Sequence, residues 1–201
     1  MQAVRTVDPT REPVEVEAFK SNTSYFEDLA DKDAFISDNL VAAREHVENI
    51  TRRAILTQTW VYYLNAFPDV DYIKLPFGNL QSVTSIKYTN SSGTQTTMTV
   101  TTEYLVETNG PEIGRIVLPY GVSWPSYTLY PSKPIAITYV CGWLAPQDVP
   151  RIIRKAVEMI AADLCENIEG QIATSNMATT GYADNPMLKR LLMSHILWDE
   201  F

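Results

Sequence analysis

The stretch from Arg52 to Thr94, RRAILTQTWVYYLNAFPDVDYIKLPFGNLQSVTSIKYTNSSGT, contains the change from helix to strand on which the fold depends. It follows an amphipathic segment and continues without a long linker into runs rich in Thr, Tyr and Val, which favour strands. The NSSG sequence at 90–93 is typical of a hairpin turn. We therefore expect a largely antiparallel β region with strands in 55–66, 71–75, 82–89, 94–102, 103–107, 113–118 and 134–142.

The segment that precedes this region, 33–54, has the pattern of a surface helix. At 100° per residue its apolar residues form one narrow stripe: Ile36, Leu40, Ala43, Val47, Ile50 and Ala54. Its charged and polar residues take the opposite side: Arg44, Glu45, Glu48, Asn49 and Arg52. Arg44, Glu48 and Arg52 are spaced four apart, so they can form a ladder of ion pairs.

Two further helices are expected after the strands. Segment 149–169 has Pro150 near its start and Gly170 just beyond its end, and it carries one broad apolar face. A long polar loop, 170–185, follows, and Asn185 and Pro186 are typical of the beginning of a final helix, 186–199. Apolar residues surround most of that last helix, so it requires burial on most sides.

The order of these segments predicts an α+β fold. We expect a helical core, made of the long N-terminal helix and the C-terminal helices, with a mainly antiparallel β subdomain inserted between them. The corresponding domains are an extended tail at 1–13, a helical core at 14–54 and 145–201 with the flexible loop 170–185, and a β subdomain at 55–144.

The charge balance argues against a nucleic-acid-binding protein. The 201-residue chain has 16 Lys and Arg against 24 Asp and Glu, a net charge of -8. Binding to phosphates needs concentrated cations that displace counterions. The opening residues lack the apolar core of a signal peptide, and no apolar run is long enough to span a membrane.

The sequence offers little catalytic or metal chemistry. It contains no glycine-rich phosphate loop, no G-x-S-x-G, no H-E-x-x-H and no C-x-x-C. His195 and Asp199 would supply two metal ligands, too few for a site, and His46 is expected on the surface. Asp69 and Asp71 fit an acidic turn after Pro68 better than an acid–base pair. We therefore predict no enzyme activity, no cofactor and no metal.

Two cysteines, Cys141 and Cys165, form no disulfide framework, and two buried thiols are the simpler interpretation, with a single disulfide as the alternative.

An ordered set of segments extends over about residues 12–169: EPVEVEAFK, AAREHVENITRRAILTQTW, IKLPFGNLQSVTSIKYTNSSGT, a later WP, ITYVCGW and VPRIIRKAVEMIAADL. This set resembles the head–tail connector (adaptor, or head completion) proteins of long-tailed double-stranded DNA phages and related gene-transfer particles. The LTQTW and LPFGNLQSVTSI blocks carry most of the likeness. Residues 170–201 match least well.

The resemblance implies a structural protein of the virion, located at the head–tail junction and assembled in the host cytoplasm. Such a protein would form a homo-oligomeric ring of about twelve copies beneath the portal protein, extend the DNA channel and dock a downstream stopper or tail-completion protein. DNA would pass an acidic wall without specific binding, and no membrane would be involved.

Two groups of residues are candidates for these contacts. The last helix could bind the portal or a neighbouring subunit, or it could pack on its own subunit. Its candidate docking residues are Leu188, Leu191, Leu192, Ile196, Trp198 and Phe201. The helical part could make ring contacts through charges, and the candidates are Arg44, Glu48, Arg151, Arg154 and Glu158.

Other functions stay open on the sequence alone. A tail tube or head decoration protein would also be a mixed chain without catalytic motifs. An enzyme whose site has no recognisable motif is a further alternative. Copy number and position in isolated particles would distinguish the virion roles.

Overall fold

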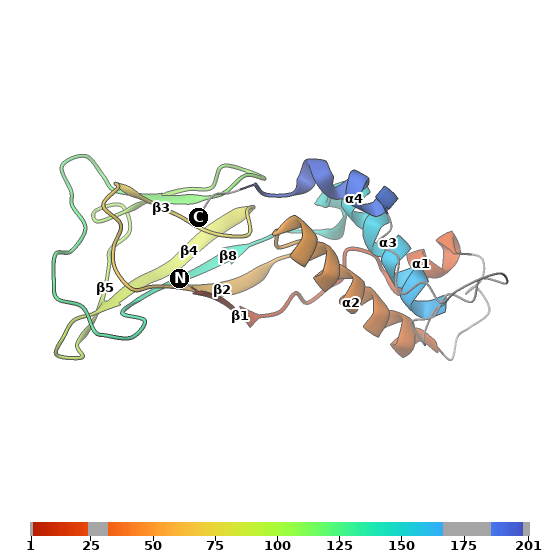
Figure 1. Cartoon of the computed structure of the whole chain (residues 1–201), viewed down its shortest axis with the longest axis horizontal. Coiled ribbons are helices and arrows are strands. Elements are labelled where there is room, and N and C mark those ends of the chain that lie inside the picture. The colour runs from red at the N-terminus through yellow and green to blue at the C-terminus, as the bar shows by residue number, and fades with distance from the viewer. Residues whose placement is uncertain (1, 24–31, 167–185, 199–201) are drawn as a thin grey trace. The chain divides into compact units, whose positions relative to one another are not determined.

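The computed structural model describes residues 2–23, 32–166 and 186–198. Within them the chain forms four short α-helices and two antiparallel sheets, with helix and strand in roughly equal amounts (Figure 1). The helices are α1 (Val16–Asn22), α2 (Asp33–Thr51), α3 (Arg151–Glu166) and α4 (Pro186–Leu192), with 3-10 turns η3 (Pro146–Asp148) and η4 (Met193–His195). The strands are β1 (Gln2–Val7), β2 (Gln58–Leu64), β3 (Tyr72–Lys74), β4 (Leu80–Thr89), β5 (Gln95–Thr97), β6 (Leu105–Glu107), β7 (Arg115–Val117) and β8 (Ile135–Cys141).

The chain divides into two compact units. The sheet unit contains the described residues of 1–10 and 56–144, and the helical unit contains those of 11–55 and 145–200. The chain therefore enters the sheet unit first, crosses into the helical unit, returns for the remaining strands and ends with helices. The predicted domain boundaries stay predictions, because compactness does not show that either unit folds alone.

The predicted fold class, an α+β fold with a long N-terminal helix in a helical core and an inserted β subdomain, is wrong. No long helix opens the described chain: Gln2–Val7 is strand β1, and the helix that follows, α1, has seven residues. Strand β1, Gln2–Val7, lies within the segment expected to be an extended tail, 1–13. Val4 lies opposite Val61 of β2, so distant backbone pairing, which no local pattern reports, turns these residues into a strand.

The larger sheet has the strand order β1-β2-β8-β4-β5, and every pairing in it is antiparallel. Register places the alternating apolar residues on one face, because Trp60 lies opposite Tyr139 and Tyr62 lies opposite Ile137. Tyr62, Ile137 and Tyr139 are buried. The alternation read from the sequence in 134–142 is thus the alternation of a sheet with one covered face.

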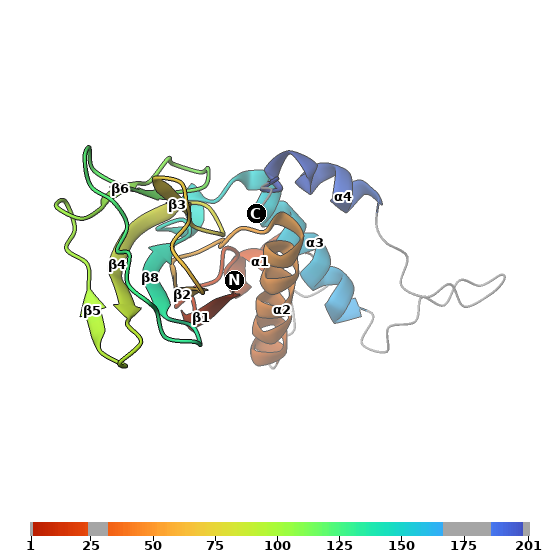
Figure 2. The same cartoon turned by 60° about the vertical axis from the view of Figure 1, so that its left-hand side comes forward.

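The smaller sheet, β3-β7-β6, belongs to the same unit, and Figure 2 shows β3 and β6 beside β4. Contacts around Pro76 join it to the larger sheet: the Tyr139 hydroxyl donates to the Pro76 carbonyl at 3.3 Å, and the ring of Phe77 lies 4.0 Å from that of Trp60. A Cβ on Gly114 would lie 2.4 Å from the Leu80 side chain. The two layers are therefore in close contact at this point.

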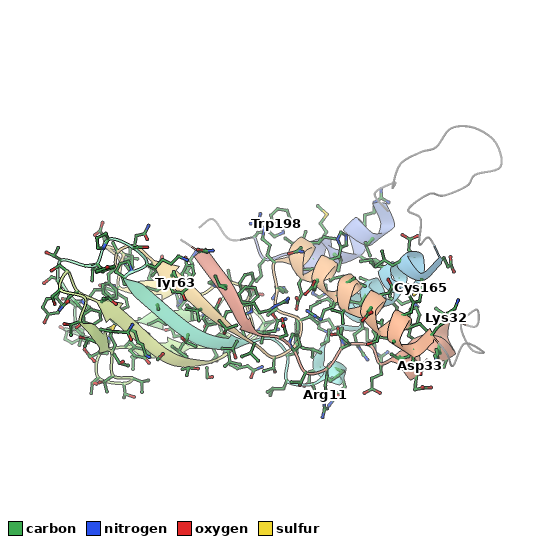
Figure 3. The ribbon with its side chains drawn as sticks, turned by 90° about the horizontal axis from the view of Figure 1, so that it is seen from below. Arg11, Lys32, Asp33, Tyr63, Cys165 and Trp198 are labelled. Carbon is green, nitrogen blue, oxygen red and sulfur yellow. The ribbon has the colours of Figure 1, made fainter. Side chains whose placement is uncertain are left out.

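The helical unit is built on α2 and α3, which run antiparallel (Figure 1). Figure 3 shows Lys32 and Asp33 near Cys165, so the beginning of α2 lies beside the end of α3. At the opposite end, the Leu197 amide donates to the Thr51 carbonyl at 3.0 Å. Fully buried side chains fill the core of the unit: Phe19, Ile36, Leu40, Val47, Ile153, Val157 and Leu192.

Candidate functional site

The described residues contain no cluster suited to binding a metal ion. No group of three or more His, Cys, Asp or Glu among them is placed to hold a metal ion. His46 and Asp69 are exposed, and Asp199, the predicted partner of His195, lies outside the described residues. Cys141 and Cys165 are both buried and unlinked. No described helix is long and apolar enough to cross a membrane.

The predicted ring charges include Arg44, on the helix α2. Arg44 is 2% exposed, although the helical pattern placed it on the solvent side. Its Nε donates to Glu12 at 2.8 Å, and its Nη1 donates to Glu48 at 2.9 Å. Residues 12–14 cover this part of α2, which is why a residue opposite the apolar stripe is buried. Arg44 thus binds partners of its own subunit.

Glu12 and Glu48 complete this cluster. Burial raises the pKa of Glu12, and the attraction of Arg44 offsets only part of that effect. Glu48 also accepts the Ile55 amide at 2.9 Å. The cluster therefore holds the segment before α1, the helix α2 and the exit from α2 together.

Glu158 also has partners in the helical unit. It accepts hydrogen bonds from Lys155 at 2.9 Å and from Asn22 at 3.3 Å, and its side chain is 14% exposed. Lys20 and Asp33 form another ion pair in the same unit. Glu158 forms no ion pair with Arg154, its neighbour one helical turn before, although their spacing would allow one.

Arg151 and Arg154 differ from the charges described so far. Arg151 is exposed and Arg154 is half-buried, and neither forms an ion pair with any other described residue. Nε of Arg154 is buried and has no hydrogen-bond partner among the described residues. Arg52, the exposed C-cap of α2, ends its helix with a left-handed φ of 55°. Because α2 and α3 are antiparallel, these arginines share one end of the unit, and we call Arg52, Arg151 and Arg154 the arginine end.

The predicted docking residues of the C-terminal segment fall into different environments. Leu188 and Leu192 are buried in the helical unit, where α4 packs on α3, and Leu191 and Ile196 are half-buried. Trp198 is 76% exposed and Met193 is 60% exposed. Phe201 lies outside the described residues.

The predicted helix over 186–199 is too long. It ends at Leu192, and η4 and an extended Ile196 follow. The Arg53 guanidinium donates to the His195 carbonyl at 2.5 Å, and Thr51 accepts the Leu197 amide. These bonds to the end of α2 replace helical bonds, so the helical wheel misplaced Trp198. Burial and Arg53 both lower the pKa of His195.

A surface that the sequence reading missed lies on the loop between β7 and β8. Tyr120, Tyr127 and Tyr130 are exposed, at 108%, 64% and 47%. The loop is fixed at its base: Trp124 stacks on Phe67 with ring centroids 5.2 Å apart, and its indole N–H donates to the Val70 carbonyl at 2.8 Å. We call Tyr120, Tyr127 and Tyr130 the tyrosine loop. The available signal was the absence of charge from 116 to 132 in a stretch rich in Tyr and Pro.

Comparison with known proteins gives a fold for the whole chain. No family model matches the sequence, and a search of curated proteins found no match. Among solved structures, a chain from the neck of an empty gene transfer agent (GTA) particle, computed with C6 symmetry, has a TM-score of 0.75 at 19% identity. A chain from the virion of a native GTA particle has a TM-score of 0.75 at 18% identity, and one from the native neck computed with C12 symmetry has 0.71 at 19%.

Each of these alignments covers 100% of this chain and 98% of the other. The predicted resemblance to connector proteins of gene-transfer particles is therefore confirmed at the level of the fold. At these identities the likeness shows a shared fold.

Proposed function

We propose that the chain is a structural protein of the neck of a tailed phage or gene-transfer particle, acting as its head–tail connector (adaptor). The observation that carries the proposal is the likeness over nearly the full length of both chains to neck and virion chains of GTA particles. A full-length match over a two-unit chain is more specific than a match of one common domain.

The proposed assembly is a closed ring, and the expected number of copies is twelve. Two of the similar structures are GTA necks computed with C6 and C12 symmetry, which supports a ring with one of these orders. A ring needs two different surfaces on each copy, one for each neighbour. The helical unit is proposed to supply them, because Arg151 and Arg154 are charged and have no partner among the described residues.

The remaining contacts are assigned to the exposed aromatic residues. Trp198 is proposed to contact the portal, since the rest of the predicted docking surface on α4 is largely buried. The tyrosine loop is proposed to contact the downstream stopper or tail-completion protein. Rigid, uncharged tyrosines supply contact area at a small cost in side-chain entropy. The net charge of -8 favours passage of DNA without binding.

The proposal is tested by deleting the gene in the source phage or particle producer. The expected result is DNA-filled heads and free tails that do not join, and purified full-length chain added to the extract restores joining. Heads that still join tails without the chain overturn the proposal. A second variant, with Tyr120 and Tyr127 changed to Ala, is expected to bind heads normally and to fail in the later step.

A further inference from the structure

We propose that the arginine end of one copy binds the carboxylates of Glu15, Glu17 and Asp38 on the next copy of the ring. This inference rests on the proposed function and names the contact through which the ring forms. It replaces Arg44, Glu48 and Glu158 as contact residues, because all three already bind residues of their own subunit.

The arginine end is a site where positive charge lacks compensation. Arg151 and Arg154 lie in the first turn of α3, where the helix dipole is already positive, and that turn contains no acidic residue. They are three residues apart, so they share one helical face. The buried Nε of Arg154 has lost contact with water and gained no acceptor among the described residues. An anionic partner would relieve the repulsion between the two guanidinium groups.

The matching carboxylates lie on the same unit, away from that end. Glu15 is the N-cap residue of α1, Glu17 is in its first turn, and Asp38 is on the second turn of α2. All three are exposed, and none has an ion pair within the described part of the chain. Glu12, close to them in sequence, is instead bound by Arg44.

One copy cannot satisfy its own arginine end with Asp38. Arg52 and Asp38 are fourteen positions apart (52 − 38) on the straight run of α2, which is about 21 Å at ~1.5 Å per residue. That separation exceeds an ion-pair distance several times over. Two complementary surfaces on different parts of one unit are what a head-to-tail contact in a ring requires.

The net charge of -8 favours a second copy of the chain over nucleic acid as the partner. An arginine cluster could also attract nucleic-acid phosphates, but a chain with this balance repels a polyanion over longer distances. A second copy supplies carboxylates at the needed surface and closes the assembly. Nucleic acid is therefore an outcome of the test that would contradict the proposal.

The test is a charge-swap experiment on the purified full-length chain. The basic-end variant is Arg151→Glu/Arg154→Glu, and the acidic-surface variant is Glu15→Arg/Glu17→Arg. Association is measured by mass photometry and sedimentation at about 10 mM salt and about 1 M salt, where the screening lengths are about 30 Å and 3 Å. The matched control is Arg11→Glu/Arg190→Glu, which changes net charge equally at two exposed residues outside the arginine end.

The wild-type chain and the control are expected to associate at low salt and to dissociate at high salt. Each swap variant alone should bind itself at least about tenfold more weakly, because like charges then face each other. An equal mixture of the two variants should regain association, since each reversed surface meets its complement. Circular dichroism checks that each variant folds. If Arg151→Glu/Arg154→Glu does not fold, the single variant Arg151→Glu, at an exposed position, replaces it in the association experiment.

Three results would overturn the contact: swap variants that associate like the wild type, a mixture that does not recover, or a wild-type chain that stays monomeric at low salt. Tight binding of the arginine end to duplex DNA would overturn it as well. The proposed function is tested separately, by locating the chain in wild-type particles. If the chain is found in the neck while any of these results holds, the contact is wrong and the neck role stands.

Discussion

Nε of Arg44 lies 2.8 Å from a carboxylate oxygen of Glu12, and the arginine side chain is 3% exposed. The pair joins α2 to the segment that precedes α1, 32 residues away in sequence. Glu48 completes the cluster at 2.9 Å. These contacts make Arg44 a structural residue of the helical unit.

Replacing Arg44 with Ala is therefore expected to destabilise the chain strongly. It leaves Glu12 and Glu48 in a poorly hydrated site without a cation, and breaking buried pairs in this way costs about 3–5 kcal/mol. The measurement is urea unfolding followed by circular dichroism. His46→Ala, at an exposed position of the same helix, should change the free energy of unfolding by less than about 0.5 kcal/mol. Equal effects of the two substitutions would show that the cluster contributes little.

The raised pKa of Glu12 predicts a pH dependence with a definite sign. Burial raises this pKa above the ordinary 4.5, so the folded chain holds the proton more tightly than the unfolded chain. The resulting stabilisation is complete below the unfolded pKa and is lost as pH rises through the folded pKa. Glu12→Gln removes this dependence. The free energy of unfolding of the wild type minus that of Glu12→Gln should therefore fall as the pH rises above the ordinary pKa of 4.5.

Glu17→Gln is the control for that titration, because it removes an exposed carboxyl that does not bind Arg44. The free energy of unfolding of the wild type minus that of Glu17→Gln should not show the fall with pH that is expected for Glu12→Gln. A difference for Glu12→Gln that rises with pH would contradict the assignment of burial as the dominant cause.

Gly142 directly follows β8 in the sheet unit, and we expect a side chain at this position to clash with its surroundings. Its φ is +106°, and a Cβ there would lie 2.2 Å from the Leu56 carbonyl oxygen. Gly93 in the hairpin also has a positive φ, +83°, with nothing within 4 Å of its Cβ position. Gly93→Ala should cost about 1–2 kcal/mol for the backbone alone. Gly142→Ala should cost clearly more, and equal melting temperatures for the two variants would contradict the close approach.

Two residues of the C-terminal segment are expected to have different roles, Leu192 in folding and Trp198 in binding. Leu192 is fully buried, so Leu192→Ala should lower the free energy of unfolding by about 2–5 kcal/mol. Trp198 is largely exposed, so Trp198→Ala should leave stability nearly unchanged and, on the proposed function, weaken attachment to portal-bearing heads. The paired measurement is thermal unfolding with sedimentation of mixtures of chain and heads. Unchanged attachment with Trp198→Ala would remove this residue from the proposed portal contact.

Sequence periodicity predicted the parts of the fold that are locally determined. Ile36, Leu40 and Val47 have helical spacing and are buried in α2, and Ile135, Ile137 and Tyr139 alternate and are buried in β8. Strand β1 was missed because Gln2–Val7 has no buried residue, and pairing with β2 alone makes it a strand. The fold class was wrong partly for this reason.

Prediction of the candidate surfaces was more limited. The helical pattern cannot show that residues 12–14 cover Arg44, nor that Glu158 binds Asn22, since both contacts depend on distant segments. It named Arg151 and Arg154 as candidate ring contacts, and in the structure Arg151 is exposed and Arg154 is half-buried. The end of α4 depends on Arg53 and Thr51, which bind the following turn from another helix.

The central claim is that this chain is a ring-forming protein of the particle neck. The most direct test is electron cryomicroscopy of particles that carry the chain with a small fused domain, with symmetry imposed only after the order has been determined. The account predicts extra density in a single ring at the head–tail junction, in twelve copies, or in six if the lower of the two symmetries holds. Extra density repeated along the tail or over the capsid surface would contradict the account and assign the chain to the tail tube or to head decoration.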